Sequence, residues 1–499
     1  MGENLVEAAA VIKLIHMKGL QIFIALFCFG SFFAQEETTE GYKKRVLETA
    51  EIDFLSSYYS QDGNNASVTG GIGTEKLTDL TATIVMSIPL NADDVLTIDA
   101  GISAYTSASS SNGNPFDISG ASGNGYDDDD DDDDYDRGSN AAAAVIGSPW
   151  LASSGASRSD VWSSVNADYA HSSDDRNTIW NADVSFATEY DYTSFGFGGG
   201  ITQLFNEKNT TIGISGKVYL DTWQPIYPTE LKAYADVNGN QNQGFFNGIT
   251  ILNQNGNAST QWRPLNGIRL IQDKGRNSYS VSFSFSQILS QNAQFSVFLD
   301  VVKQQGWLAN PLQRVYFGDV PNYYIGNAAS IPNYTSSNNT DVFQLADDIE
   351  RLPSNRLKIP VGVRLNYFVN EVISLRTYYR YYFDDWGMHS NTASLEMPIK
   401  ISDQFTLYPS YRYYDQTNAD YFAPYEQNLS TSEFYTSDFD LAQFSAQQFG
   451  MGLSYTDIFT KAHLWKIGLK SIDFKYNNYQ RSNGLNAHFM GIGFKFVID

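Results

Sequence analysis

The sequence alternates apolar and polar residues over many short segments with a period of two. In residues 278–290, for example, Tyr279, Val281, Phe283 and Phe285 are each followed by a serine. A period of two places successive side chains on opposite faces of a β-strand. Each such segment is therefore predicted to be a strand with one face in an apolar environment and the other in a polar one.

Applied along the whole chain, this pattern predicts sixteen strands, most of them 12–15 residues long. They cover residues 46–59, 78–89, 94–107, 159–172, 178–192, 194–205, 210–222, 278–290, 293–305, 357–368, 371–383, 390–401, 404–415, 444–457, 463–477 and 487–498. A tilted strand crosses a bilayer in roughly 9–11 residues, so we expect the strand ends to project from it.

The connections between the predicted strands differ in length between the two ends of the barrel. Every second connection is a tight turn, and the long ones all fall on the other side: 60–77, 108–158, 223–277, 306–356 and 416–443. Short periplasmic turns opposite long extracellular loops are typical of outer-membrane barrels. The sequence therefore predicts an all-β fold, a transmembrane antiparallel up-and-down β-barrel of about sixteen strands. A soluble sandwich or propeller predicts neither the lopsided loops nor one uninterrupted set of strands.

The composition favours the same fold. Aromatic residues make up 14% of the chain, and charged residues reach only 18%, against about 25% in a typical soluble domain. Aromatic girdles and glycine suit a membrane barrel. No run beyond residue 34 approaches the roughly 18 apolar residues of a membrane helix, which excludes a helical membrane protein. The net charge of −24 argues against nucleic acid as a partner.

Residues 1–34 are predicted to be a secretory signal peptide. Met17 and Lys18 open a short basic region, an apolar run follows over residues 20–33, and Ala34 precedes polar sequence. This order is typical of a cleaved signal, and Met17 is the better candidate for the true start. The apolar run is too short for an anchor helix across a hydrocarbon core of ~30 Å.

Cleavage after Ala34 leaves residues 35–499 as one outer-membrane barrel domain. It also removes Cys28, the only cysteine of the chain, and with it any disulfide or thiol chemistry. The predicted location is the cell outer membrane, with the lipid bilayer and lipopolysaccharide as surroundings. Barrel-insertion machinery and periplasmic chaperones are the expected partners during export.

Six stretches carry a resemblance to a known family. They are SYYSQDG at 57–63, VTGGIGTEKL at 68–77, DAGISAYTSASSS at 99–111, NPLQRVYF at 310–317, RTYYRYYFDDWG at 376–387 and YRYYDQTNADYFAPY at 411–425. Together they resemble a family of uncharacterised outer-membrane β-barrel proteins of Gram-negative bacteria, known only as a domain of unknown function. The resemblance covers nearly the whole mature chain. It implies the barrel fold and the outer-membrane location, and it implies no activity.

Strand parity assigns two groups of charged residues to the inner face of the predicted barrel. The lumen-lining candidates are Arg364, Arg376, Arg380 and Arg412 on one side, and Asp99, Asp168, Asp183, Glu189 and Asp191 on the other. The two groups are nearly opposite across a sixteen-stranded barrel. They would set a transverse field in a water-filled lumen and favour dipolar or zwitterionic solutes. The alternative is that these charges pair with neighbours or with an inserted loop and only keep the lumen polar.

A run of eight aspartates is the most conspicuous segment of the long acidic loop 108–158. Like charges in a block repel one another and stay extended, which favours a solvated outer loop. The functional alternative is weak Ca²⁺ binding, with bridging to lipopolysaccharide, because hard cations prefer carboxylate oxygens. The candidate ligands are Asp127, Asp128, Asp129, Asp130, Asp131, Asp132, Asp133 and Asp134. No other cofactor is predicted.

Catalysis has little support in the sequence. The local candidate is His389-Ser390-Asn391 at the outer end of a predicted strand, but adjacent residues on a strand point to opposite faces, so His389 and Ser390 would not pair without a bend. No Gly-rich phosphate loop, CxxC or HExxH pattern occurs. The chain is therefore predicted not to be an enzyme.

Two functions remain. The first is a porin-like channel for small polar solutes, with the Arg and Asp/Glu walls in its lumen. The second is a closed barrel whose extracellular loops bind a surface partner or divalent cations without transport. Three of the predicted loops are long enough to plug or cap the barrel, which favours the second hypothesis. They are 108–158, 223–277 and 306–356.

Overall fold

The computed structural model describes residues 45–498 apart from 108–148, 151–159, 266–267, 269–270, 272–273 and 340. The chain divides into two compact units, Met1–Arg45 and Val46–Asp499, and the description below concerns the second. Among the described residues, no helix combines the length and the apolar character needed to cross a membrane.

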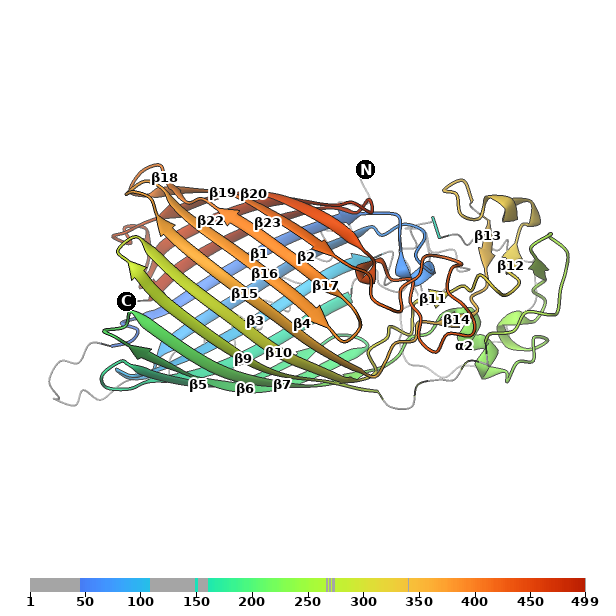
Figure 1. Ribbon diagram of the computed structural model, residues 1–499, viewed down its shortest axis with the longest axis horizontal. Coiled ribbons are helices and arrows are strands. Elements are labelled where there is room, and N and C mark those ends of the chain that lie inside the picture. The colour runs from blue at the N-terminus through green and yellow to red at the C-terminus, as the bar shows by residue number, and fades with distance from the viewer. Residues whose placement is uncertain are drawn as a thin grey trace. The chain divides into compact units, whose positions relative to one another are not determined.

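Within the described residues, sixteen long antiparallel strands form one closed barrel (Figure 1). They are β1 (Ala50–Asp62), β2 (Leu77–Pro89), β3 (Asp94–Ser107), β4 (Asp160–Ser172), β5 (Thr178–Thr188), β6 (Tyr192–Phe205), β7 (Thr210–Trp223), β9 (Gly275–Ser290), β10 (Ala293–Gly306), β15 (Asn355–Phe368), β16 (Ser374–Asp384), β17 (His389–Glu396), β19 (Phe405–Gln416), β20 (Phe444–Thr456), β22 (Ile467–Arg481) and β23 (Asn486–Ile498). The last strand, β23, pairs with β1 and closes the sheet. The predicted fold is confirmed, and each predicted strand overlaps one barrel strand.

Two of the predicted strands are interrupted or displaced near a turn. The segment predicted at 390–401 breaks at Pro398 and resumes as the short β18 (Ile399–Lys400), because proline has no N–H to donate to the ladder. The segment predicted at 463–477 contains a hairpin instead. Its first residues form β21 (His463–Leu464), which folds back on Ile467 and Gly468 of β22.

The outer face of the barrel is apolar and exposed. Ile201, Ile214 and Phe283 lie side by side on β6, β7 and β9, and their exposed fractions are 47%, 44% and 45%. A soluble monomer rarely leaves such a continuous apolar surface in water, where each exposed Å² costs about 25 cal/mol. This face fits the hydrocarbon of a bilayer.

The long connections gather at one end of the barrel, and the tight turns lie at the other (Figure 1). Four of the long connections carry short elements that the period-two pattern does not predict. They are η1 (Ser67–Thr69), α2 (Thr229–Asp236), η2 (Gly244–Phe246), β8 (Ile251–Asn253), β11 (Arg314–Val315), β12 (Tyr323–Gly326), η3 (Ala328–Asn333), β13 (Val342–Gln344), β14 (Asp348–Ile349) and η4 (Phe439–Leu441). We call the described parts of residues 63–76, 224–274, 307–354 and 417–443 the cap.

The cap has a hydrophobic core of its own. Leu231, Trp262, Tyr316 and Ile349 are fully buried there and come from two different connections. Tyr425, from a third connection, packs against the same cluster. The loops of this end therefore form a packed structure and not a set of separate solvated segments.

A buried ion pair ties three connections of the cap together. Arg314 and Glu230 are both 0% exposed, and the Arg314 Nε lies 2.7 Å from the Glu230 Oε1. The Arg314 Nη2 donates to the other carboxylate oxygen at 3.1 Å, and its Nη1 donates to the carbonyl oxygen of Val68 at 3.2 Å. Such a bidentate pair fixes geometry as well as charge.

Candidate functional site

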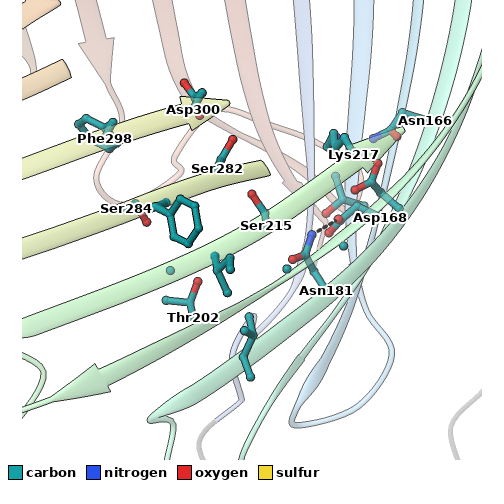
Figure 2. A pocket seen from close by; sticks show the side chains of 18 of the residues that line it. Asn166, Asp168, Asn181, Thr202, Ser215, Lys217, Ser282, Ser284, Phe298 and Asp300 are labelled. Carbon is teal, nitrogen blue, oxygen red and sulfur yellow. Dashed lines mark hydrogen bonds and ion pairs between the residues drawn. The ribbon is translucent and has the colours of Figure 1, made fainter. Parts of the chain in front are cut away.

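The barrel encloses a polar cavity of about 700 Å³, which we call the lumen cavity. Figure 2 shows several of its lining side chains, among them Asp168, Lys217, Ser282 and Asp300, converging from neighbouring strands. Three of the predicted lumen residues, Asp168, Asp183 and Arg364, line it. The cavity therefore brings side chains of both signs to one space.

The acidic side of the lumen cavity contains a cation that the sequence reasoning missed. The Lys217 Nζ lies 3.0 Å from the Asp183 Oδ2. The two residues are on β7 and β5, and Gly198 of β6 lies between them in register. A Cβ at Gly198 would lie 2.8 Å from the Lys217 Cγ and 2.9 Å from an Asp183 oxygen. The missing side chain thus lets Lys217 reach across a strand.

The other acids of this side differ in their surroundings. Asp168 lies directly opposite Asp183 in the sheet and accepts a hydrogen bond from the Asn181 Nδ2 at 2.7 Å. Asp99 lies opposite Asn166 on β4 and, together with Lys217, lines another cavity beside the lumen cavity. Lys217 therefore faces acids on both sides.

The structure corrects the position of Glu189 and Asp191. The strand predicted at 178–192 ends at Thr188, and residues 189–191 form the turn into β6. The Glu189 N–H donates to the Tyr192 carbonyl at 2.8 Å, and Asp191 accepts from the Trp223 Nε1 at 3.0 Å. The apolar–polar alternation continues through this turn, since Tyr190 lies between the two acids, so the pattern did not mark the end of the strand.

The predicted arginines lie on β15, β16 and β19, and their contacts differ. The Arg376 Nη1 lies 2.8 Å from the Glu396 Oε1, while 53% of the Arg376 side chain stays exposed. The Arg364 guanidinium lies 5.4 Å from the Phe298 ring centre and 5.7 Å from that of Tyr378. Arg380 is opposite Thr392 across β16 and β17, and Arg412 is opposite Gln448 across β19 and β20.

Neither side of the lumen therefore has charge of a single sign. Glu396 stands among the arginines and Lys217 among the acids. Glu396 has the same strand parity as Ser394, and Lys217 has the same parity as Ser215. Strand parity could therefore have placed both Glu396 and Lys217 on the inner face of the barrel. The pairs weaken the expected transverse field, because each places opposite charges within a few ångströms.

A separate cavity of about 260 Å³ lies where the cap meets the barrel wall, and we call it the cap-floor pocket. The wall contributes Trp223, Arg276, Gln304, Arg356 and Lys358, and the connections contribute Leu308, Asn310, Gln313, Glu350, Leu352, Trp386, Asp438, Asp440 and Leu441. The basic residues thus come from the wall and the acidic ones from the cap. Sequence reasoning did not find this site, because no strand parity applies to the cap.

Two acids of the cap, Glu350 and Asp347, are shielded from water. Burial raises the pKa of Glu350 to about 8, and the nearby charge of Asp438 adds to this effect. Glu350 also accepts hydrogen bonds from the Asn310 N–H at 2.6 Å and from the Thr436 hydroxyl at 2.5 Å. Burial raises the pKa of Asp347 in the same way, to about 7. Protonated carboxyl groups are therefore part of the folded cap at neutral pH.

The aspartate run 127–134 and the predicted signal peptide 1–34 lie outside the described residues. In the part of the chain that the structure does describe, no group of three or more His, Cys, Asp or Glu side chains is arranged to hold a metal ion. The His389 Nδ1 lies 2.9 Å from the Tyr381 hydroxyl oxygen.

A closed sixteen-stranded barrel with an apolar outer face and a charged interior defines the class of transmembrane β-barrels. The chain belongs to the family described as Protein of unknown function (DUF3570), whose profile matches residues 20–493. The resemblance found in the sequence is thus confirmed. No curated protein matches the sequence.

Several solved structures are similar in fold, each covering about nine tenths of this chain. A bacterial polysaccharide outer membrane secretin is 9% identical, with 90% of this chain and 99% of that chain covered and a TM-score of 0.40. A FadL homologue from Pseudomonas aeruginosa is 9% identical, with 91% of each chain covered and a TM-score of 0.34. The outer membrane protein opdK from the same organism is 7% identical, with 90% and 99% covered and a TM-score of 0.33. At these values the likeness carries no argument about solutes.

Proposed function

We propose that the protein is a channel of the cell outer membrane that passes small polar solutes through a charged lumen. The observation that carries the proposal is the lumen cavity, a polar space of about 700 Å³ inside an apolar barrel. Water and hydrophilic solutes are compatible with its lining, whereas a barrel built only as an anchor needs no such space. The chemistry is passive transfer, with no catalytic step.

Seven predicted residues that lie on barrel strands are proposed to set the selectivity of this channel: Arg364, Arg376, Arg380, Arg412, Asp99, Asp168 and Asp183. Glu189 and Asp191 are proposed to contribute from the turn between β5 and β6. Arg376 supports the idea best, because half of its side chain is exposed although it pairs with Glu396. The pairs with Lys217 and Glu396 favour solutes that carry both signs over simple ions, since a dipolar solute can exchange with either member of a pair.

The test is single-channel conductance of the refolded mature protein, residues 35–499, in a planar bilayer. A channel gives steady conductance steps, and Arg376→Glu shifts the reversal potential in a salt gradient toward cation selectivity. A folded barrel that conducts no ions contradicts the proposal. Heat-modifiable migration on a gel establishes folding in each case.

A second function is favoured by one observation, the packed cap with its own core. In this alternative the barrel is closed and the cap binds a surface partner. A silent barrel that gains conductance when residues 307–354 are replaced by a short turn would favour this alternative over the open channel.

The location and the processing are part of the same proposal. Residues 1–34 are proposed to be removed on export, with Met17 as the start of translation, and the cap is proposed to face the cell exterior. The mass of the protein isolated from outer membranes tests the cleavage after Ala34.

A further inference from the structure

The barrel wall at the cap-floor pocket carries more positive charge than its neighbours neutralise. Arg276, Arg356 and Lys358 all line the pocket. Arg356 pairs with Asp384, whose carboxylate oxygen lies 2.6 Å from the Arg356 Nη2. Among the described residues, neither Arg276 nor Lys358 has a carboxylate oxygen within the 4.0 Å of an ion pair. Asp221 lies opposite Arg276 in the sheet, and Asp384 lies opposite Lys358. Each cation therefore has an acid nearby, but neither cation forms an ion pair with a described carboxylate.

The three cations are held close to one another by the strands. Arg356 and Lys358 are two residues apart on β15, so they share a face. Gln304 of β10 is opposite Arg356, and the next inward position, Gly306, is opposite Arg276 on β9. Like charges at this spacing repel one another. A bound anion would relieve the repulsion.

Two tryptophans hold the arginines in place. The Arg356 guanidinium lies 4.2 Å from the Trp386 ring centre, and the Arg276 guanidinium lies 5.6 Å from that of Trp223. A guanidinium stacked on a ring keeps its N–H groups at its edge, where they match the two oxygens of a carboxylate. Stacking thus prepares Arg276 for an anion and lowers the entropic cost of binding it.

The cap side of the pocket offers acceptors instead. Gln313 is 7% exposed, and its Oε1 has no hydrogen-bond partner among the described residues. Asp438 accepts from the Gln313 Nε2 at 3.2 Å and from the Asp440 N–H at 2.9 Å, and it is a further acceptor in the lining of the pocket. An unpaired buried acceptor is costly, about 1–3 kcal/mol. A ligand donor at this place would satisfy it.

We propose that the cap-floor pocket binds a small organic carboxylate that also carries hydroxyl or ammonium donors. Its carboxylate lies against Arg276 and Lys358, and its donors face Gln313 and Asp438. A volume of 260 Å³ is below the roughly 300–1,000 Å³ of pockets for drug-sized ligands, which limits the solute to a small one. The inference rests on the proposed channel function and names the solute class that the channel admits at its mouth.

The test measures binding in detergent, without transport. The refolded full-length mature chain is titrated with glycerate and with glycerol, its neutral analogue, in a calorimeter. The matched variants are the pair Arg276→Gln with Lys358→Met, and the control Lys303→Met. Lys303 is a cation of β10 at a similar height, opposite Tyr279 and Leu357 on the outer face.

The expected result is saturable binding of glycerate and none of glycerol. The double variant loses at least about tenfold in affinity, because charge-assisted hydrogen bonds are the strong ones, while Lys303→Met stays within about twofold of the parent. Equal binding by the double variant overturns the site, and so does the absence of saturable binding by the parent protein. In the second case Asp221, opposite Arg276 in the sheet, is the neutralising anion.

The two proposals fail separately. Conductance without saturable glycerate binding refutes the carboxylate site and leaves the channel. Glycerate binding by a barrel that conducts no ions refutes the channel and leaves the site as a receptor pocket.

Discussion

Removing one member of the buried pair in the cap should destabilise the cap and leave the barrel intact. Glu230→Ala leaves the Arg314 guanidinium 0% exposed without its carboxylate. Breaking a buried pair in this way costs about 3–5 kcal/mol, because the remaining charge is neither hydrated nor neutralised. The Val68 carbonyl, the other acceptor of Arg314, offsets only a small part of this loss.

The expected loss of cap stability can be measured as an increase in the rate of amide hydrogen exchange. If the cap opens locally, each 1.4 kcal/mol multiplies the open population by about ten. Amides of residues 314–316 and 345–349 should therefore exchange roughly two to three and a half decades faster in Glu230→Ala. Amides of the barrel strands, such as those of β22, should not change.

The matched control is the double variant Glu230→Ala with Arg314→Met. An apolar side chain of similar length removes the uncompensated charge, so most of the lost protection should return. The reasoning is refuted if Glu230→Ala leaves cap exchange unchanged, or if the double variant exchanges as fast as the single one. Uniform loss of protection in cap and barrel would also refute it, since it would show that the two unfold as one unit.

Three further predictions concern the lumen, the cap and the acidic loop. Gly198→Ala should force Lys217 away from Asp183, which is 5% exposed. The variant should therefore lose heat-modifiable migration at a lower temperature than the parent protein. The control is Gly216→Ala on β7, whose added Cβ would lie 3.5 Å from the nearest atom, the Ser280 carbonyl oxygen, and should not change that temperature. The pKa of Glu350 is raised from 4.5 to about 8, so the folded cap binds more protons than the unfolded cap, and its stability should fall as the pH rises through this interval. Glu350→Gln should reduce that slope in limited proteolysis of the cap and leave the part that Asp347 contributes, since the pKa of Asp347 is also raised, to about 7. A slope equal to that of the parent protein would exclude Glu350 as a source. Replacing residues 127–134 by serine and asparagine should abolish Ca²⁺ binding with dissociation constants of about 10⁻⁴–10⁻³ M in equilibrium dialysis, and unchanged binding would locate the ion elsewhere.

The barrel was predictable from the sequence because lipid and water impose a strict period of two. Segments such as 278–290 meet hydrocarbon on one face and polar surroundings on the other, so the alternation of apolar and polar residues indicates both the strand and its two faces. The errors occur where that constraint ends. Tyr190 continues the alternation through a turn. His463 and Leu464 were included in a predicted strand but fold back on Ile467 and Gly468 as a hairpin.

The cap could not be predicted in the same way. Its core joins Leu231, Trp262 and Tyr316 from connections far apart in the sequence, and no local period reports such contacts. The lumen pairs were within reach of parity counting, but their distances were not. Lys217 reaches Asp183 because Gly198, between them, has no side chain. The role of this glycine can be recognised only when the register of the three strands is known.

The contact of Arg314 with Glu230 and Val68 also has a consequence for biogenesis. The three residues belong to the connections after β10, β7 and β1, so they meet only when strands from both halves of the chain have been inserted next to each other. The barrel itself closes only when β23 reaches β1, which must come after synthesis of the last residues. A protease-resistant cap is therefore a late marker of maturation. It distinguishes finished molecules from partly inserted ones, in which these loops are still separate and open to cleavage.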